Sequence, residues 1–264
     1  MTRVVTAIIM GFVFVAAIWC LPISGFKGVL LAVTLLGGIE FSRMFFAEKI
    51  ERKICVTAIL AAAIPMIWMT DTPAAIISIS VAMLFTVSVL FMRSTPRLEG
   101  VADRIGLATL GMMYLGIAFP FWAWIRELPF GNSMVLLAMA PACLCDTFAY
   151  VAGKSFGRHK FAPMVSPNKT MEGFFAALAG SMTGAFLIRW LLLPEMDAVA
   201  TAGLAAVIWI TSTFGDLIES MFKRSCGVKD SGSIIPGHGG ILDRLDALIF
   251  TAPFAFIYFK YVIG

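Results

Sequence analysis

Residues 73–92 read PAAIISISVAMLFTVSVLFM, a stretch that contains no charged side chain. A helix needs about 20 such residues to cross the ~30 Å hydrocarbon core of a bilayer. Comparable runs follow one another along the chain, which is 60% hydrophobic and 14% charged and has a mean hydropathy of +0.92. Soluble domains carry about 25% charged residues, so a soluble globule is excluded. The alternating segments of a membrane β-barrel are not seen, and the sequence predicts an all-α polytopic transmembrane helical bundle.

The apolar runs between charge clusters predict nine spans. They cover residues 4–22, 26–46, 54–70, 73–92, 105–125, 132–152, 173–193, 198–220 and 247–263. No small-residue cleavage site follows the first run, so the first helix is expected to be retained. We expect one membrane domain over residues 1–264. Its helices in 1–125 would be a scaffold with lipid or oligomer contacts, and 132–264 would hold the catalytic helices and cytoplasmic loops.

The basic residues predict the orientation of these spans, because loops on the cytoplasmic side carry an excess of Lys and Arg. With nine spans, all of the 20 Lys and Arg except Lys27, Arg126, Arg189 and Lys260 fall on one side. The N-terminus is therefore predicted to be cytoplasmic and the C-terminus to face outward. The basic side would attract anionic lipid headgroups and nucleotides. For the loops around 43–53 and 93–104, a topology signal alone is a sufficient explanation.

Carboxylates inside a bilayer are costly, about 2.5 to 3.5 kcal/mol at a helix centre, and are candidates for function. Glu40, Asp146, Asp216 and Glu219 lie in the cytoplasmic parts of their predicted spans. We expect a polar cavity that opens to the cytoplasmic face. Glu40 also fits a near-interface carboxylate paired with Arg43, and it is not placed in the site.

The densest polar group ends the predicted eighth span and consists of Asp216, Glu219, Ser220 and Lys223. Their spacings put all four on one helical face. A polar loop follows and leads into the ninth span. Its notable residues, with those at the start of that span, are Arg224, Lys229, Asp230, His238, Asp243, Arg244 and Asp246.

Asp243 and Asp246 share a helical face, and with Asp216 they are predicted to form a group of three carboxylates. Unpaired carboxylates repel one another, whereas a hard divalent cation keeps them ionised. Mg²⁺ is the expected ion, since it is bound by one or two carboxylates, waters and substrate phosphates. The neighbouring cations would neutralise charge during phosphoryl-type transfer, which indicates a nucleoside triphosphate. These cations are Lys223, Arg224, Lys229 and Arg244.

A second polar segment covers residues 153–173. Its Gly153, Lys154 and Ser155 match half of a Walker A loop, but position 148 is Phe, so that interpretation is rejected. Pro167 and the small polar residues beside it predict a rigid turn before the seventh span. Lys169 would then lie near a helix N-terminus, where phosphate is also favoured.

Residues 220–246 read SMFKRSCGVKDSGSIIPGHGGILDRLD and closely resemble the motif of the phosphatidate cytidylyltransferases, also called CDP-diacylglycerol synthases, of the polytopic type. Further similarity lies in the group around Asp146 to Gly157 and in SPNKTMEG at 166–173, where Asn168 departs from the usual Lys or Gly. The resemblance implies transfer of CMP from CTP to phosphatidic acid, giving CDP-diacylglycerol and pyrophosphate. It also implies a bacterial inner membrane, an active site facing the cytoplasm and a homodimer. No nucleic-acid partner is expected.

The resemblance also implies roles for single residues. Asp216 and Asp243 would be the principal metal ligands, with Asp246 as a further ligand or an orienting group. The sequence leaves open a second, monovalent cation beside Mg²⁺. Residues expected to bind phosphates of CTP or lipid are Lys223, Arg224, Lys229 and Lys169. Supporting residues are Asp146, Ser166, Ser220, Asp230, His238 and Arg244, with His238 expected to organise its loop rather than act as a base.

Two other classes of function use similar residues. A CTP-dependent enzyme acting on an ether lipid or a polyprenol, including a polyprenol kinase, would need much the same carboxylates and cations. A proton-coupled transporter would also place acids within its spans. Inverted halves are not visible in the sequence, and the match over 220–246 favours phosphatidic acid as the acceptor.

Overall fold

The computed structural model describes residues 15–69, 72–94, 98–232 and 239–263. In these ranges the regular elements are helices, apart from one two-stranded sheet. Contacts divide the chain into two compact units. The first comprises Met1–Trp124 with Asp230–Asp243, and the second comprises Ile125–Lys229 with Arg244–Gly264. The predicted all-α polytopic fold is confirmed.

Seven helical segments in the described ranges are long and apolar enough to cross a membrane. They match seven of the nine predicted spans. Most of the predicted first span, 4–22, lies outside the described residues. The predicted third span is helical, but its charged first turns, KIERK, make it less apolar than the other seven. The count of nine and the orientation stay predictions.

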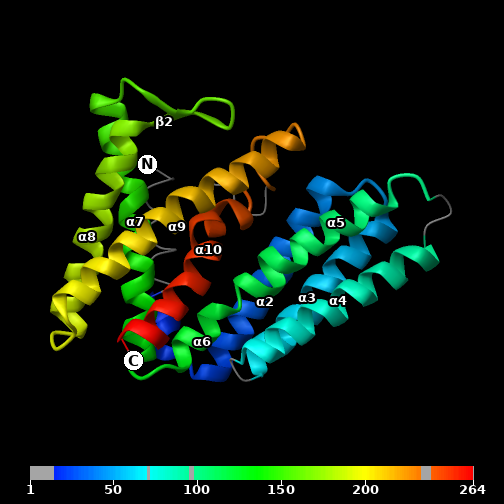
Figure 1. Ribbon diagram of the computed structural model, residues 1–264, viewed down its shortest axis with the longest axis horizontal. Coiled ribbons are helices and arrows are strands. Elements are labelled where there is room, and N and C mark those ends of the chain that lie inside the picture. The colour runs from blue at the N-terminus through cyan, green and yellow to red at the C-terminus, as the bar shows by residue number, and fades with distance from the viewer. Residues whose placement is uncertain (1–14, 70–71, 95–97, 233–238, 264) are drawn as a thin grey trace. The chain divides into compact units, whose positions relative to one another are not determined.

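The first unit is built on α2 (Ile23–Phe45), α3 (Lys49–Trp68), α4 (Pro73–Ser94) and α5 (Val101–Gly111). Helix α5 continues through the π-helical η1 (Met112–Ala118), and α6 (Phe121–Glu127) follows. Helix α3 packs against α2, α4 and η1, and Figure 1 shows α4 beside α3. In the most apolar stretch of α4, 11% of the residues are buried inside the protein. Such low burial is expected of a helix whose outer faces contact lipid.

The second unit contains α7 (Gly131–Phe156), a β-hairpin, α8 (Met171–Leu192), α9 (Ala198–Ser225) and η2 (Phe259–Ile263). Helix α10 (Leu242–Tyr258) begins in the first unit with Leu242 and Asp243 and belongs to the second from Arg244 onward. Helices α7 and α8 pack along their length because two glycines let their backbones approach. A Cβ at Gly180 would lie 2.4 Å from the Leu144 oxygen, and one at Gly184 would lie 2.8 Å from Pro141. Helix α8 packs in turn on α9.

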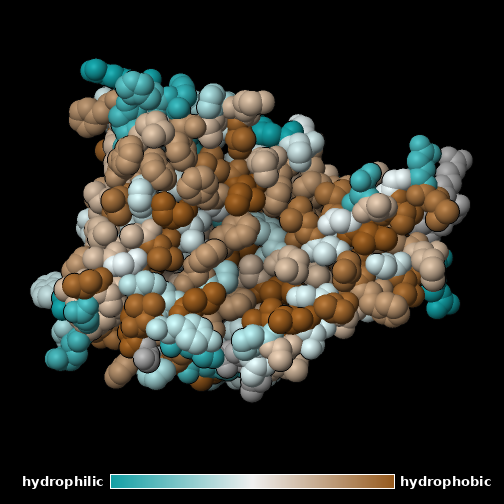
Figure 2. All heavy atoms as spheres, in the orientation of Figure 1, coloured by the Kyte–Doolittle hydropathy of each residue, from teal (hydrophilic) through white to brown (hydrophobic). Residues whose placement is uncertain are grey.

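The hairpin pairs β1 (Lys160–Ala162) with β2 (Ser166–Thr170) in antiparallel register. The sequence predicted a rigid turn over the second of these stretches, and it is instead a short strand. Thr170 then caps α8, since its hydroxyl oxygen accepts a hydrogen bond from the Gly173 amide at 3.1 Å. In Figure 2, hydrophilic atoms of the second unit gather at the hairpin and at the turn between α8 and α9, with hydrophobic atoms along the helices between them.

Candidate active site

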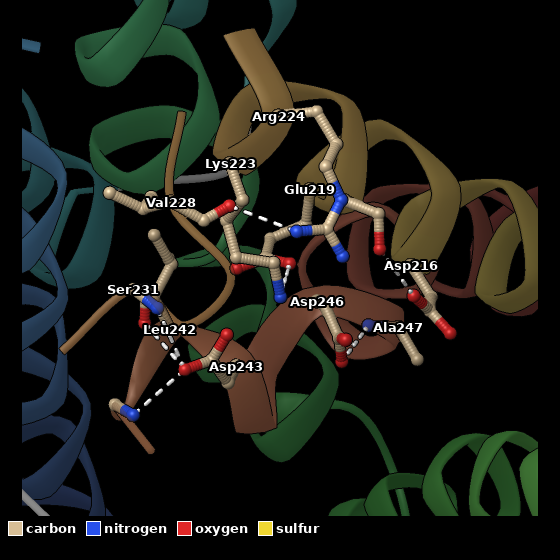
Figure 3. Close-up of polar contacts among 12 residues, drawn as sticks. Asp216, Glu219, Lys223, Arg224, Val228, Ser231, Leu242, Asp243, Asp246 and Ala247 are labelled. Carbon is tan, nitrogen blue, oxygen red and sulfur yellow. Dashed lines mark hydrogen bonds and ion pairs between the residues drawn. The ribbon is translucent and has the colours of Figure 1, made fainter. Parts of the chain in front are cut away.

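Three carboxylates from three helices of the second unit lie within electrostatic reach of one another. Asp146 comes from α7, Asp216 from α9 and Asp246 from α10, and their negative charges repel. The backbone amide of Ala247 donates to Asp246 Oδ1 at 2.8 Å, which orients that carboxylate (Figure 3). Of the three carboxylates predicted to lie together, Asp216 and Asp246 thus interact electrostatically, and so does Asp146, which was expected at the same polar cavity.

Asp216 is held by two of the predicted site residues. Lys169 Nζ, from strand β2, lies 2.7 Å from Asp216 Oδ2, and both side chains are 25% exposed. Ser220 Oγ, one turn further along α9, donates to Asp216 Oδ1 at 3.2 Å. Both oxygens of Asp216 therefore have a protein partner that could be exchanged for a ligand at the partly open side.

A cavity of about 530 Å³ opens next to this group and is lined by α7, the hairpin, α8 and α9. Its volume is in the range of small-molecule sites, about 300–1,000 Å³. Asp146 and Asp216 supply its acidic groups, and three lysines supply its cations. The lysines are Lys154, Lys160 and Lys169. A cavity with several ammonium groups fits a polyphosphate.

Two glycines bring backbone to the wall of this cavity. A Cβ at Gly157 would lie 2.2 Å from the Gly153 oxygen, and one at Gly173 would lie 2.8 Å from the Ala149 oxygen. The first turn of α8 therefore packs directly on α7, with Thr170 and Gly173 in the lining. The partial positive charge of the α8 N-terminus adds to the effect of the lysines.

Lys223, predicted to bind phosphate, lies in a different environment. It forms an ion pair with Glu219 one turn earlier on α9, and both side chains are buried. The four residues that were predicted to share one face of α9 thus form two i, i+4 pairs (Figure 3). A direct contact of Lys223 with phosphate stays a prediction.

The other predicted residues of the second unit are more exposed. Arg224 donates from Nη1 to the Val228 oxygen at 3.1 Å, across the turn that follows α9 (Figure 3). Lys229 and Arg244 are exposed, and Ser166 begins β2 opposite Ala162 rather than lining the cavity.

Asp243 belongs to the first unit, where it organises the loop before α10. Its Oδ2 accepts hydrogen bonds from the Ser231 amide and hydroxyl, both at 2.9 Å, and from the Gly240 amide at 2.8 Å. Asp230 precedes this cluster and is exposed. His238, the expected loop organiser, lies outside the described residues. The metal-ligand role of Asp243 stays a prediction.

The described residues contain no group of three or more His, Cys, Asp or Glu side chains arranged to hold a metal ion. Two carboxylates suffice for Mg²⁺ when waters and substrate phosphates complete its coordination. Asp216 and Asp246 lie in one unit and interact electrostatically, and carboxylate oxygens are ligands that Mg²⁺ accepts.

Several cavity residues were not predicted as site residues. Lys154 and Lys160 lay in the basic segment 153–173 and could have been chosen from its charge. Phe161 and Phe174 stack at 4.7 Å between centroids and form an aromatic wall. They come from the hairpin and from α8, so no local pattern joins them.

Comparison with known proteins identifies the family of the chain. The model of the cytidylyltransferase family matches residues 1–262. The chain is 33% identical, over its whole length and 97% of the relative, to a phosphatidate cytidylyltransferase of Thermotoga maritima. Enzymes of the same name match over shorter stretches: 41% identity over 54% of the chain and 55% of the protein from Staphylococcus aureus, and 36% over 58% of each from Bacillus subtilis. The resemblance seen in the sequence is confirmed: the chain belongs to the cytidylyltransferase family.

Proposed function

We propose that this protein is a phosphatidate cytidylyltransferase of the membrane, which transfers CMP from CTP to phosphatidic acid. The observation that carries the proposal is the cavity that combines Asp146 and Asp216 with three lysines at one end of apolar helices. A water-soluble triphosphate and a lipid phosphate have to meet at such a boundary. The names of the relatives support the same reaction.

In this reaction a phosphate oxygen of phosphatidic acid attacks the α-phosphorus of CTP. The bond between that phosphorus and the oxygen bridging to the β-phosphate breaks, and pyrophosphate leaves with the electron pair. The nucleophile belongs to the substrate, so the protein needs no covalent intermediate. Its work is to hold two anionic groups in line and to neutralise the charge that they bring together.

Lys154, Lys160 and Lys169 carry that neutralisation in the proposed reaction. Lys169 is well suited because its present partner, Asp216, is a carboxylate at the same cavity. When a triphosphate enters, the ammonium group can move to a phosphate oxygen, provided that another cation takes its place beside Asp216.

Asp216 and Asp246 of the second unit are proposed to hold Mg²⁺. The sequence-based assignment of Asp243 as a principal ligand stays a prediction. The ion would supply charge neutralisation on the phosphates of CTP. Asp146 adds negative charge to the group and strengthens its affinity for a cation. A second, monovalent cation stays open.

The site is proposed to face the cytoplasm of a bacterial inner membrane, because most Lys and Arg lie on the side predicted to be cytoplasmic. CTP is available there, and phosphatidic acid reaches the same boundary from the membrane. A homodimer is also proposed, on the family resemblance alone.

The test is pyrophosphate release by the purified protein in detergent with CTP and Mg²⁺, with and without phosphatidic acid. Release that depends on phosphatidic acid, together with a CDP-lipid product, supports the proposal. Release that requires an ether-lipid or polyprenyl phosphate instead would overturn the assigned acceptor, and transfer of the γ-phosphoryl group to polyprenol would identify a kinase. Asp216→Asn is the control for activity of the site.

A further inference from the structure

Glu40 of α2 is a buried carboxylate whose partners all lie about two hundred positions later in the chain. Its side chain is 1% exposed. Oε1 accepts a hydrogen bond from the Ile241 amide at 3.1 Å, and Oε2 accepts one from the Leu242 amide at 2.9 Å. Ser231 Oγ donates to Oε2 at 3.2 Å. A buried charge is costly unless it is hydrogen-bonded in this way, so the contact is specific.

The two amides belong to the start of α10, which begins at Leu242. The first amides of a helix have no partner within the helix, and its N-terminus carries partial positive charge. Glu40, which belongs to another helix of the same unit, accepts hydrogen bonds from these amides and places a negative charge beside the partial positive charge. It serves as a cap for α10 that the local sequence does not provide.

Ser231 joins this cap to the loop cluster around Asp243. Its hydroxyl lies 3.2 Å from Glu40 Oε2 and 2.9 Å from Asp243 Oδ2. Figure 3 shows the Ser231 and Asp243 side of this contact. The two carboxylates therefore hold both ends of the loop, at Ser231 before it and at Gly240 to Leu242 after it.

Two glycines show how closely the loop backbone surrounds Glu40. A Cβ at Gly232 would lie 2.4 Å from Glu40 Oε1, with further atoms of the same side chain next nearest. A Cβ at Gly240 would lie 2.4 Å from Oε2. No larger residue fits at either position while the carboxylate stays in place.

From these contacts we infer that Glu40 is a positioning residue for nucleotidyl transfer. It fixes the start of α10 and thereby the direction of Asp243, which lies in the same unit. Arg43, the partner suggested by the local sequence, is exposed, and the hydrogen bonds of Glu40 in the described residues run to Ser231, Ile241 and Leu242 instead. The inference rests on the proposed function for its catalytic consequence, but the structural contact can be tested without substrate.

The first test measures amide hydrogen exchange of peptides covering residues 239–242 in the full-length protein in detergent. Glu40→Ala is expected to speed exchange of the Ile241 and Leu242 amides. Glu51→Gln is the matched control, because Glu51 is a carboxylate of the same unit that pairs with Arg104 instead. Unchanged exchange in Glu40→Ala would overturn the cap, whatever reaction the protein performs.

The second test separates positioning from binding. Glu40→Ala is expected to lower kcat by at least about tenfold, because small misplacements of catalytic groups are costly. The KM for CTP should stay within about twofold, since the cavity is lined by other residues. Glu40→Gln keeps one acceptor oxygen and should give an intermediate kcat. A normal kcat in Glu40→Ala, in a preparation whose wild type is active, would refute the inference and leave the proposed function intact.

The third test uses Gly232→Ala, whose added methyl group would meet Glu40 alone among its nearest atoms. As a single change it should lower kcat and speed exchange of the same amides. In the double variant with Glu40→Ala, the Gly232→Ala change should have little further effect on kcat or exchange, because the Glu40 carboxylate that the methyl group would meet is absent. Effects that simply add would show that Gly232 and Glu40 act separately, and would overturn the inference even if Glu40→Ala alone were poorly folded.

Discussion

Helix α9 carries two ion pairs that differ in how much water reaches them. The Lys169–Asp216 pair lies at the cavity with both side chains 25% exposed, whereas the Lys223–Glu219 pair is 10% and 0% exposed. A lysine near solvent can exchange its carboxylate for a phosphate at small cost. If a buried lysine moves away from its partner, the buried carboxylate keeps a charge that no cation compensates, which is costly. The comparison supports the proposal that Lys169 contacts a substrate phosphate, and it indicates that the Lys223–Glu219 pair stabilises α9.

Asp216→Asn is expected to have the largest effect on activity of the three changes considered for these pairs. The change keeps the size of the side chain but removes the charge that the proposed cation and Lys169 both need. We expect kcat to fall by roughly a thousandfold, comparable to the loss of a main electrostatic group in other enzymes. Pyrophosphate release measures the effect, and an unchanged elution profile in detergent is the control for folding. A fully active variant would remove Asp216 from the site.

Lys223→Ala tests the buried pair. It leaves the Glu219 carboxylate without its cation, and loss of one partner of a buried pair costs about 3 to 5 kcal/mol of stability. A lower Tm in detergent is expected. Replacing both partners, as Glu219→Gln with Lys223→Met, should recover most of the loss. An unchanged Tm with a raised CTP requirement would instead support direct contact of Lys223 with phosphate.

Lys169→Ala is the mildest of the three changes. The Tm should hardly change, because a partly exposed ion pair such as Lys169–Asp216 contributes little to stability. The KM for CTP should rise by roughly tenfold, since a hydrogen bond to a charged group contributes about 1.5–3 kcal/mol. Lys169→Arg should retain part of the affinity. Equal KM values for wild type and Lys169→Ala would exclude a phosphate contact.

Helical spacing and hydropathy predicted much of the fold and part of the site. The run at 73–92 is α4, and Asp216 with Ser220 and Glu219 with Lys223 are i, i+4 pairs, as their spacing required. Such features depend on one helix and are visible in a short window.

Other features depend on contacts between distant segments and could not be predicted in this way. The spacing on α9 does not show that Glu219 is buried while Asp216 is open, because neighbouring helices decide that. For Glu40, pairing with its near neighbour Arg43 is one alternative that the local sequence offers, whereas its partners lie in the loop before α10 and at the first residue of that helix.

The path of the chain between the two units limits how this family can be recombined. The chain leaves the second unit after Lys229, contributes Asp230–Asp243 to the first, and returns at Arg244. A chimera that takes residues 1–124 from one relative and the remainder from another would therefore combine a foreign α2 with the loop it holds. Exchange of both segments together preserves Glu40 with its own glycines. The loop and the N-terminal helices thus have to be exchanged as one set, although more than a hundred residues separate them in the sequence.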